Sequence, residues 1–207
     1  MEINTIRLRK MLGWLGIFLP WIVALLLLMI PQSISSTYYT YQAGPVFMII
    51  LGSSCFLLIS YKGYDKFDDI LNTFAGIFGL GICLFPCWND SLEKVGTFQL
   101  PNNISSKVHA GCAILFFILL AYNSLFRFTK HGKIMTKRKK IRNIIYIICG
   151  IGMLLSFCIL LLPSFRIRIW LVETIALFFF GISFLTKANC YKFLACDEKI
   201  GVWSYEW

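Results

Sequence analysis

The residue with the clearest potential for chemistry is an acidic side chain in apolar surroundings. Glu173 is the one carboxylate inside an apolar block long enough to span a membrane. A carboxylate within a bilayer is costly, so its presence favours a binding or catalytic role. Arg166 and Trp170 precede Glu173 by seven and three residues, which places all three on one face of a helix.

A histidine at the same predicted depth is the second candidate. His109 begins another apolar block at the same end of the predicted helices as Glu173. Ser35, Tyr38 and Tyr39 lie in an uncharged segment at that end, where their side chains can close a pocket. We therefore expect a site at the outer leaflet of a membrane, formed by these five residues with Arg166 and Trp170.

A structural role is the alternative for both titratable residues. In this alternative, Glu173 reaches the membrane interface or pairs with Arg166 or Arg168, and it serves only to fix its helix. A histidine at an interface often serves only as the polar end of a helix. The sequence leaves these alternatives open.

The usage of histidine and cysteine argues against haem and metal chemistry. The two histidines, His109 and His131, lie about a membrane thickness apart in the predicted topology, so they do not form a pair of axial haem ligands. The eight cysteines include no pair of CxxC motifs, which structural zinc sites use. We expect no cofactor and no metal.

A basic cluster is the other chemically distinctive feature. Five basic residues lie directly before or at the start of the fifth apolar block, namely Lys137, Arg138, Lys139, Lys140 and Arg142. At a cytoplasmic membrane surface each such residue contributes about 1 kcal/mol of attraction to anionic lipid. We expect these residues to contact anionic headgroups. Three alternatives are open for the acidic loop 61–69: it is solvated, it forms salt bridges with the basic loop 127–142, or it binds a cation.

Six apolar blocks must position these residues. Each block is close to the length that spans a bilayer as a helix, and a backbone in lipid must satisfy its own hydrogen bonds. The hydrophobic fraction is 58% and the charged fraction is 14%, whereas a soluble domain is about 25% charged. We predict an all-α, polytopic transmembrane bundle in one membrane domain (1–187), followed by a tail (188–207). The six predicted spans are 11–30, 44–61, 70–88, 108–126, 144–163 and 169–186.

The distribution of lysine and arginine orients the predicted bundle. Sixteen of the 20 basic residues lie in the N-terminal segment, the connections after the second and fourth blocks, and the C-terminal tail. The positive-inside rule places these segments in the cytoplasm, so both termini are predicted to face it. The same bias accounts for the net charge of +10 without a nucleic-acid partner. The expected partners are the lipid bilayer and, in addition, a second copy or another membrane protein.

Glycine and proline within the blocks predict local packing. Gly76, Gly79 and Gly81 fall in the third block, where small residues let helix backbones approach closely. Pro20 and Pro86 are expected to kink their helices.

Several short motifs follow one another in a recognisable order, namely Leu12–Gly16, Ser33–Ser35, Tyr38–Thr40, Ser60–Asp65, Ala75–Phe78, Arg142–Gly150, Trp170–Glu173 and Phe180–Ser183. Up to about residue 187, the chain resembles a group of small bacterial six-helix membrane proteins, and more distantly the DRAM-like and Sfk-like families. The resemblance implies a six-helix fold in a bacterial cytoplasmic membrane, but no settled activity. It also implies three typical features, namely an outer segment with serine and tyrosine, a histidine in the fourth span and a glutamate in the sixth span. The matching residues here are Ser35, Tyr38, Tyr39, His109 and Glu173.

Three classes of function follow as hypotheses. The first is a transporter, sensor or scaffold that binds a lipid or small amphiphile in the outer-leaflet pocket. The second is a membrane effector or a subunit of a complex, which acts through association. The third is an intramembrane enzyme in which Glu173 and His109 form an acid–base pair. The first is preferred to the second, and the third ranks last because no convincing nucleophile or metal set accompanies the pair.

Overall fold

Long helices account for most of the chain in the computed structural model, which describes residues 2–130, 136–161 and 168–189. The fold class is all-α, as the apolar blocks predict. The α-helices of the described part are α1 (Glu2–Leu27), α2 (Gly44–Ile59), α3 (Lys66–Leu84), α4 (Asn102–Tyr122), α5 (Lys137–Ser156) and α6 (Arg168–Lys187). Shorter elements are the 3₁₀ helices η1 (Ser35–Tyr39) and η3 (Phe157–Leu161), the π-helix η2 (Asn123–Arg127), and the antiparallel strands β1 (Lys94–Val95) and β2 (Leu100–Pro101).

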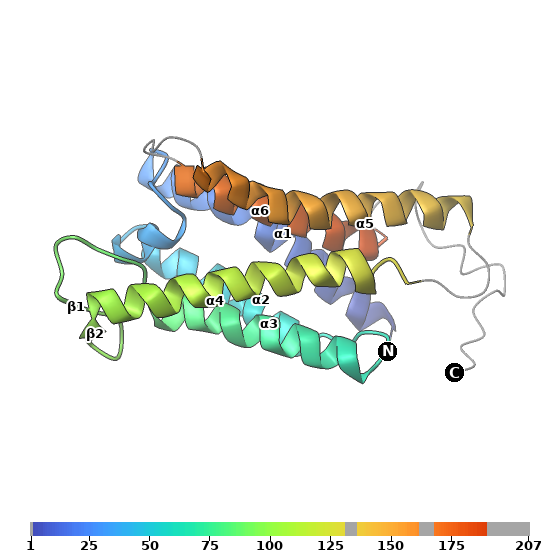
Figure 1. Cartoon of the computed structure of the whole chain (residues 1–207), viewed down its shortest axis with the longest axis horizontal. Helices are drawn as coiled ribbons and strands as arrows, with labels where there is room; N and C mark the ends of the chain where they lie inside the picture. Colours follow the sequence, from blue (N-terminus) through green and yellow to red (C-terminus); the bar gives the residue numbers. More distant parts are fainter. Residues whose placement is uncertain (1, 131–135, 162–167, 190–207) are drawn as a thin grey trace.

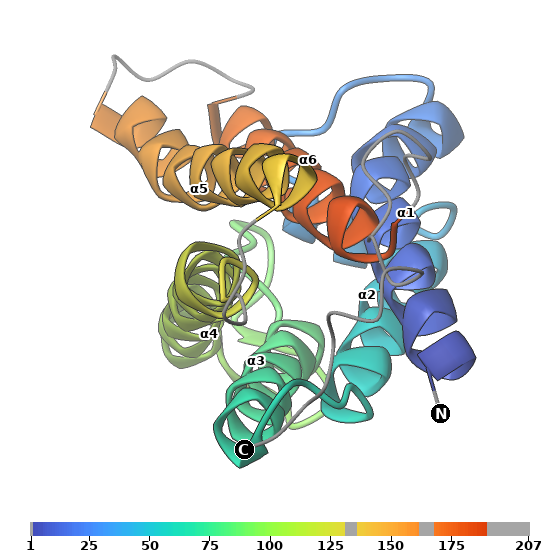
Figure 2. The same ribbon diagram turned by 90° about the vertical axis from the view of Figure 1, so that its right-hand side faces the viewer.

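The helices form a closed ring in chain order. Each helix packs against the next, and α6 completes the ring by packing against α1. All six run along the long axis of the molecule (Figure 1), and the view along that axis shows them around a common centre (Figure 2). The end that carries η1 and the β1–β2 hairpin is called the outer end below, and the end where α1, α3 and α5 begin is called the inner end.

Local sequence signals set where the helices begin and end. Asp65 caps α3 by accepting a hydrogen bond from the backbone N–H of Asp68 at 3.0 Å, and Thr136 caps α5 in the same way. α3 ends at Leu84, so Pro86 follows the helix instead of kinking it. The reason is that a residue before proline disfavours helical backbone angles, and Phe85 is extended. The predicted third block, 70–88, therefore had the right length but lay four residues too far along the chain.

Glycines allow the closest contacts between helices. A Cβ atom built on Gly181 of α6 would lie 2.6 Å from the carbonyl oxygen of Gly13 on α1, and one built on Gly13 would lie 2.9 Å from that of Gly181. A Cβ on Gly76 would likewise lie 2.6 Å from the carbonyl oxygen of Cys55 on α2. The predicted role of small residues in the third block is thus confirmed for its contact with α2.

Five helices of the described part are long and apolar enough to cross a membrane. They include all the α-helices except α2, which is apolar but has only 16 residues. α6 is the most buried of the five, with 61% of its apolar window inside the protein. A side chain on its inward face is therefore surrounded by other helices, which bears on the position of Glu173.

Candidate functional site

A short segment at the outer end folds over the ring. It comprises Ser33 to Tyr39 and includes η1, and it is called the roof below. Ser33 and Ser36 bind each other's backbone: Ser36 N–H donates to Ser33 Oγ at 2.9 Å, and Ser36 Oγ donates to the Ser33 carbonyl at 2.8 Å. Thr37 Oγ1 donates to the Ile34 carbonyl at 2.6 Å. Such local hydrogen bonds favour turns over long helices, so the roof folds as a compact turn.

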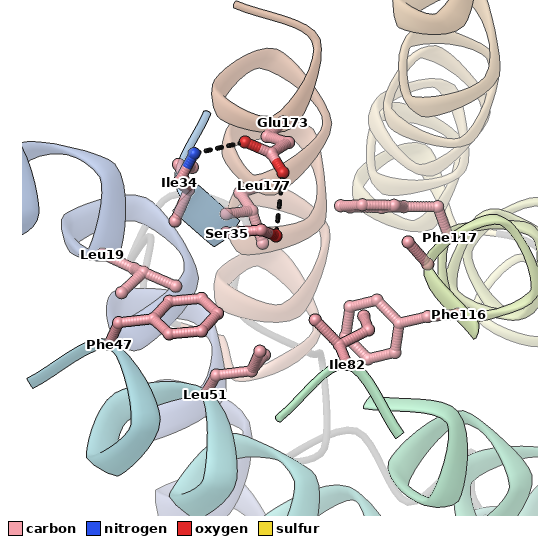
Figure 3. A pocket seen from close by; sticks show the side chains of 11 residues that line it. Leu19, Ile34, Ser35, Phe47, Leu51, Ile82, Phe116, Phe117, Glu173 and Leu177 are labelled. Carbon is pink, nitrogen blue, oxygen red and sulfur yellow. Dashed lines mark hydrogen bonds between the residues drawn. The ribbon is translucent and has the colours of Figure 1, made fainter. Parts of the chain in front are cut away.

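Glu173 binds the roof. Its Oε2 accepts a hydrogen bond from the backbone N–H of Ile34 at 2.5 Å, and its Oε1 accepts one from Ser35 Oγ at 3.1 Å (Figure 3). One turn earlier in α6, the backbone N–H of Trp170 donates to the carbonyl of Gln32 at 3.1 Å. The start of α6 is therefore fixed to the roof by the side chain of Glu173, and to the residue before the roof by a backbone hydrogen bond.

A small half-open cavity lies beneath the roof. Its volume is about 40 Å³, and its wall comes from α1, α2, α3, α4, α6 and the roof. Nine of the eleven lining residues are apolar, and the polar ones are Ser35 and Glu173. Figure 3 shows the Glu173–Ser35 pair at one side of this apolar space. The apolar lining residues are Leu19, Ile34, Phe47, Leu51, Ile82, Ala113, Phe116, Phe117 and Leu177.

His109 does not join Glu173 in this site. Its Nδ1 lies 2.8 Å from the carbonyl oxygen of Phe85, just beyond the end of α3. It is buried, but it is not among the described residues that line the cavity. The two side chains have separate partners, so the structure offers no acid–base pair formed by Glu173 and His109.

The two tyrosines hold the roof from its other end. Tyr39 donates its hydroxyl to the carbonyl of Cys87 at 2.6 Å, and its ring packs edge-on against Tyr38 at 5.1 Å between centroids. Burial, together with the nearby Cys87 and Tyr38, raises the pKa of Tyr39 above its ordinary value. Tyr39 thus acts as a neutral hydrogen-bond donor that anchors the roof, and neither tyrosine lines the cavity.

The two remaining residues of the predicted outer site have different outcomes. Trp170 is only 5% exposed and packs edge-on against Trp21 of α1 at 5.8 Å between centroids. Its indole N–H has no hydrogen-bond acceptor among the described residues. Arg166 lies outside the described residues. Of the predicted set, Ser35 and Glu173 therefore line the cavity, and Trp170 and Tyr39 position the elements around it.

The predicted basic cluster divides into two groups. Lys137, Arg138 and Lys140 are exposed at the inner end. Lys139 and Arg142 are buried instead, because their spacing of three residues places them on the inward face of α5. Lys139 Nζ donates to the carbonyl of Phe128 at 2.8 Å. Contact with lipid headgroups therefore stays a prediction for the first three residues, whereas the other two make contacts within the protein.

A buried ion pair at the inner end was only partly anticipated. Asp68 is 2% exposed and pairs with Nε of Arg127, which lies in the π-helix η2. Arg127 also binds Asp65 at 2.6 Å, and Lys130 binds Asp65 at 3.0 Å. The Asp68 backbone N–H, with these two cations, lowers the pKa of Asp65 below its ordinary value. The alternative of salt bridges between the acidic and basic loops is thus confirmed for these residues.

Lys187 forms a contact that the sequence did not indicate. Its Nζ lies 4.2 Å from the ring centroid of Tyr64, 5.3 Å from that of Phe128 and 6.0 Å from that of Tyr146. Arg9 adds a further cation over Tyr61 at 5.3 Å. Cation–π contacts of this kind are stronger when they are desolvated. These contacts join α1 and the end of α6 to the connection between α2 and α3, and Lys187 also joins α6 to α5.

No known protein family matches this chain, and no curated protein or solved structure matches it. The function of the chain must therefore be inferred from its helices, its cavity and its polar contacts.

Proposed function

We propose that this chain is an integral membrane protein whose six helices all cross the bilayer, with both termini in the cytoplasm. Five helices have sufficient length and apolarity, and the lysine and arginine bias supports the orientation. α2 has 16 residues and measures about 24 Å, which is less than the ~30 Å of a hydrocarbon core. Local bilayer thinning accommodates such a helix at a modest cost. Because α2 lies between α1 and α3 in the ring, we expect it to cross with them.

The inner end is then the cytoplasmic face and carries an anionic-lipid contact. The exposed residues Lys137, Arg138 and Lys140 support this assignment. They lie at the start of α5, at the same end of the ring as the start of α1 (Figure 1). Their attraction to an anionic leaflet is screened by salt.

The proposed activity is binding of a small amphiphile at the outer end. The observation that carries it is the half-open cavity, which has an apolar wall and one polar edge formed by Glu173 and Ser35. Ligand sites typically combine an apolar lining with a few convergent polar groups. At about 40 Å³ the cavity holds only a part of a lipid. The protein would thus act as a sensor, scaffold or transporter component that retains an amphiphile at the outer leaflet.

Filling the cavity tests this proposal. Ala113 lines the cavity on α4, so Ala113→Phe should abolish retention of a photoreactive long-chain alcohol by the purified protein. Gly111→Phe is the matched control, because no atom lies within 4 Å of a Cβ at Gly111 on the same helix. Labelling is measured by mass spectrometry after irradiation. Equal labelling of wild type and Ala113→Phe at this cavity would contradict the proposal, whereas stable co-purification of another subunit would favour an effector role.

A further inference from the structure

The polar edge of the cavity restricts which amphiphile fits it. We propose, on the basis of the proposed function, that the ligand has a hydrogen-bond-donating headgroup, with an ammonium preferred to a hydroxyl, and that anionic amphiphiles are excluded. The headgroup would bind the carboxylate of Glu173, and the alkyl chain would leave by the open side of the cavity.

Glu173 has acceptor capacity to spare. Its oxygens accept hydrogen bonds from Ile34 N–H and from Ser35 Oγ, and the backbone N–H of Ser35 also faces the carboxylate. An ionised carboxylate has about four lone-pair sites. At least one site therefore remains for a ligand. A donor placed there completes the hydrogen bonding of a carboxylate that would otherwise be partly unsatisfied in apolar surroundings.

The described lining of the cavity gives an anionic headgroup neither a positive charge nor a hydrogen-bond donor that is not already bound to Glu173. The hydroxyl proton of Ser35 and the N–H of Ile34 are both directed at Glu173. Every other lining residue is apolar. The nearest described basic side chain on α6, Arg168, donates to the carbonyl of Leu160 at 3.2 Å. A carboxylate or phosphate group would therefore meet a like charge in a medium of low dielectric constant, where repulsion is strong.

The size of the cavity limits what enters it. A water molecule needs about 10–15 Å³ of cavity volume, so a cavity of about 40 Å³ holds a headgroup of about three non-hydrogen atoms. A primary amine or alcohol with its first methylene groups meets this limit, but a phosphocholine or a sugar does not.

The test compares three probes with the same twelve-carbon chain: dodecylamine, dodecanol and dodecanoate. Each probe displaces the photoreactive alcohol from the purified full-length protein in a non-ionic detergent at neutral pH. We expect dodecylamine to displace it at about a tenth of the concentration that dodecanoate needs, which corresponds to about 1.4 kcal/mol. Dodecanol should fall between them.

Variants assign the preference to Glu173. Glu173→Gln should remove the advantage of the amine, whereas Glu93→Gln, which removes an exposed charge at the same end of the molecule, should retain it. Should Glu173→Gln fail to fold, Ser35→Ala provides a second test. It keeps the carboxylate and frees Oε1 from its serine donor, so the amine should remain the best probe.

The outcomes separate this inference from the proposed function. Displacement by all three probes at equal concentrations, or best by dodecanoate, would overturn the headgroup preference and leave amphiphile binding intact. Loss of the amine preference in Ser35→Ala would also overturn it, because Glu173 is still present. Failure of the photoreactive alcohol to label the wild-type cavity at all would instead overturn the proposed function.

Discussion

At the scale of single residues, the buried pair of Asp68 and Arg127 should dominate the stability of the inner end. Asp68 is buried, and one of its oxygens also accepts from the backbone N–H of Tyr64 at 2.7 Å. Asp68→Ala leaves a buried guanidinium with only Asp65 as its carboxylate partner. We expect a loss of about 3 kcal/mol, the lower end of the range for breaking a buried pair. Thermal unfolding of the purified protein in detergent measures it.

The neighbouring Asp69 provides the control for this prediction. Asp69 pairs with Lys62, whose side chain is 75% exposed, at 3.2 Å. Exposed pairs contribute about 1 kcal/mol or less, so Asp69→Ala should lower the melting temperature far less than Asp68→Ala. Similar losses in both variants would show that burial does not strengthen the Asp68 contact.

At the scale of helices, the contact between α1 and α6 should depend on glycine. A methyl group on Gly181 would meet the backbone oxygen of Gly13 at 2.6 Å, and the helices would have to separate. We expect Gly181→Ala to cost about 1–3 kcal/mol, as overpacking of a close contact does. Gly111→Ala on α4 has open space and should be neutral or stabilising, since alanine favours helix by up to about 1 kcal/mol. Apparent melting temperatures that shift equally would contradict the tight α1–α6 contact.

At the scale of the whole molecule, the six-span arrangement predicts which connections share a side of the membrane. Reporter fusions placed after Asn102 and after Ile134 should report opposite sides, with Ile134 in the cytoplasm, because α4 lies between them. The bias of lysine and arginine supports the direction. A cytoplasmic signal from both fusions would show that α4 does not cross, and the ring would then require another orientation.

The shortest of the six described α-helices, α2, ends earlier than its apolar block predicts. Its predicted block ended at Tyr61, whereas the helix ends at Ile59. Tyr61 is instead buried at the inner end, where its hydroxyl accepts a hydrogen bond from Nε of Arg9 at 3.0 Å. The apolar pattern located the element correctly, but a buried aromatic residue with a polar partner looks like a continuation of an apolar helix in sequence alone.

The sequence by itself determined that the described chain is helical and where its helices lie, because apolar length and capping residues act within single segments. It also identified Glu173 and Ser35, since a carboxylate in an apolar block is conspicuous wherever it points. The tertiary structure alone decided their partners. Glu173 binds Ile34 and Ser35, which lie 139 and 138 residues away in the chain, and His109 binds Phe85 instead. Such pairings depend on the order and rotation of helices in the ring, and neither is fixed by the hydrophobicity of any one helix.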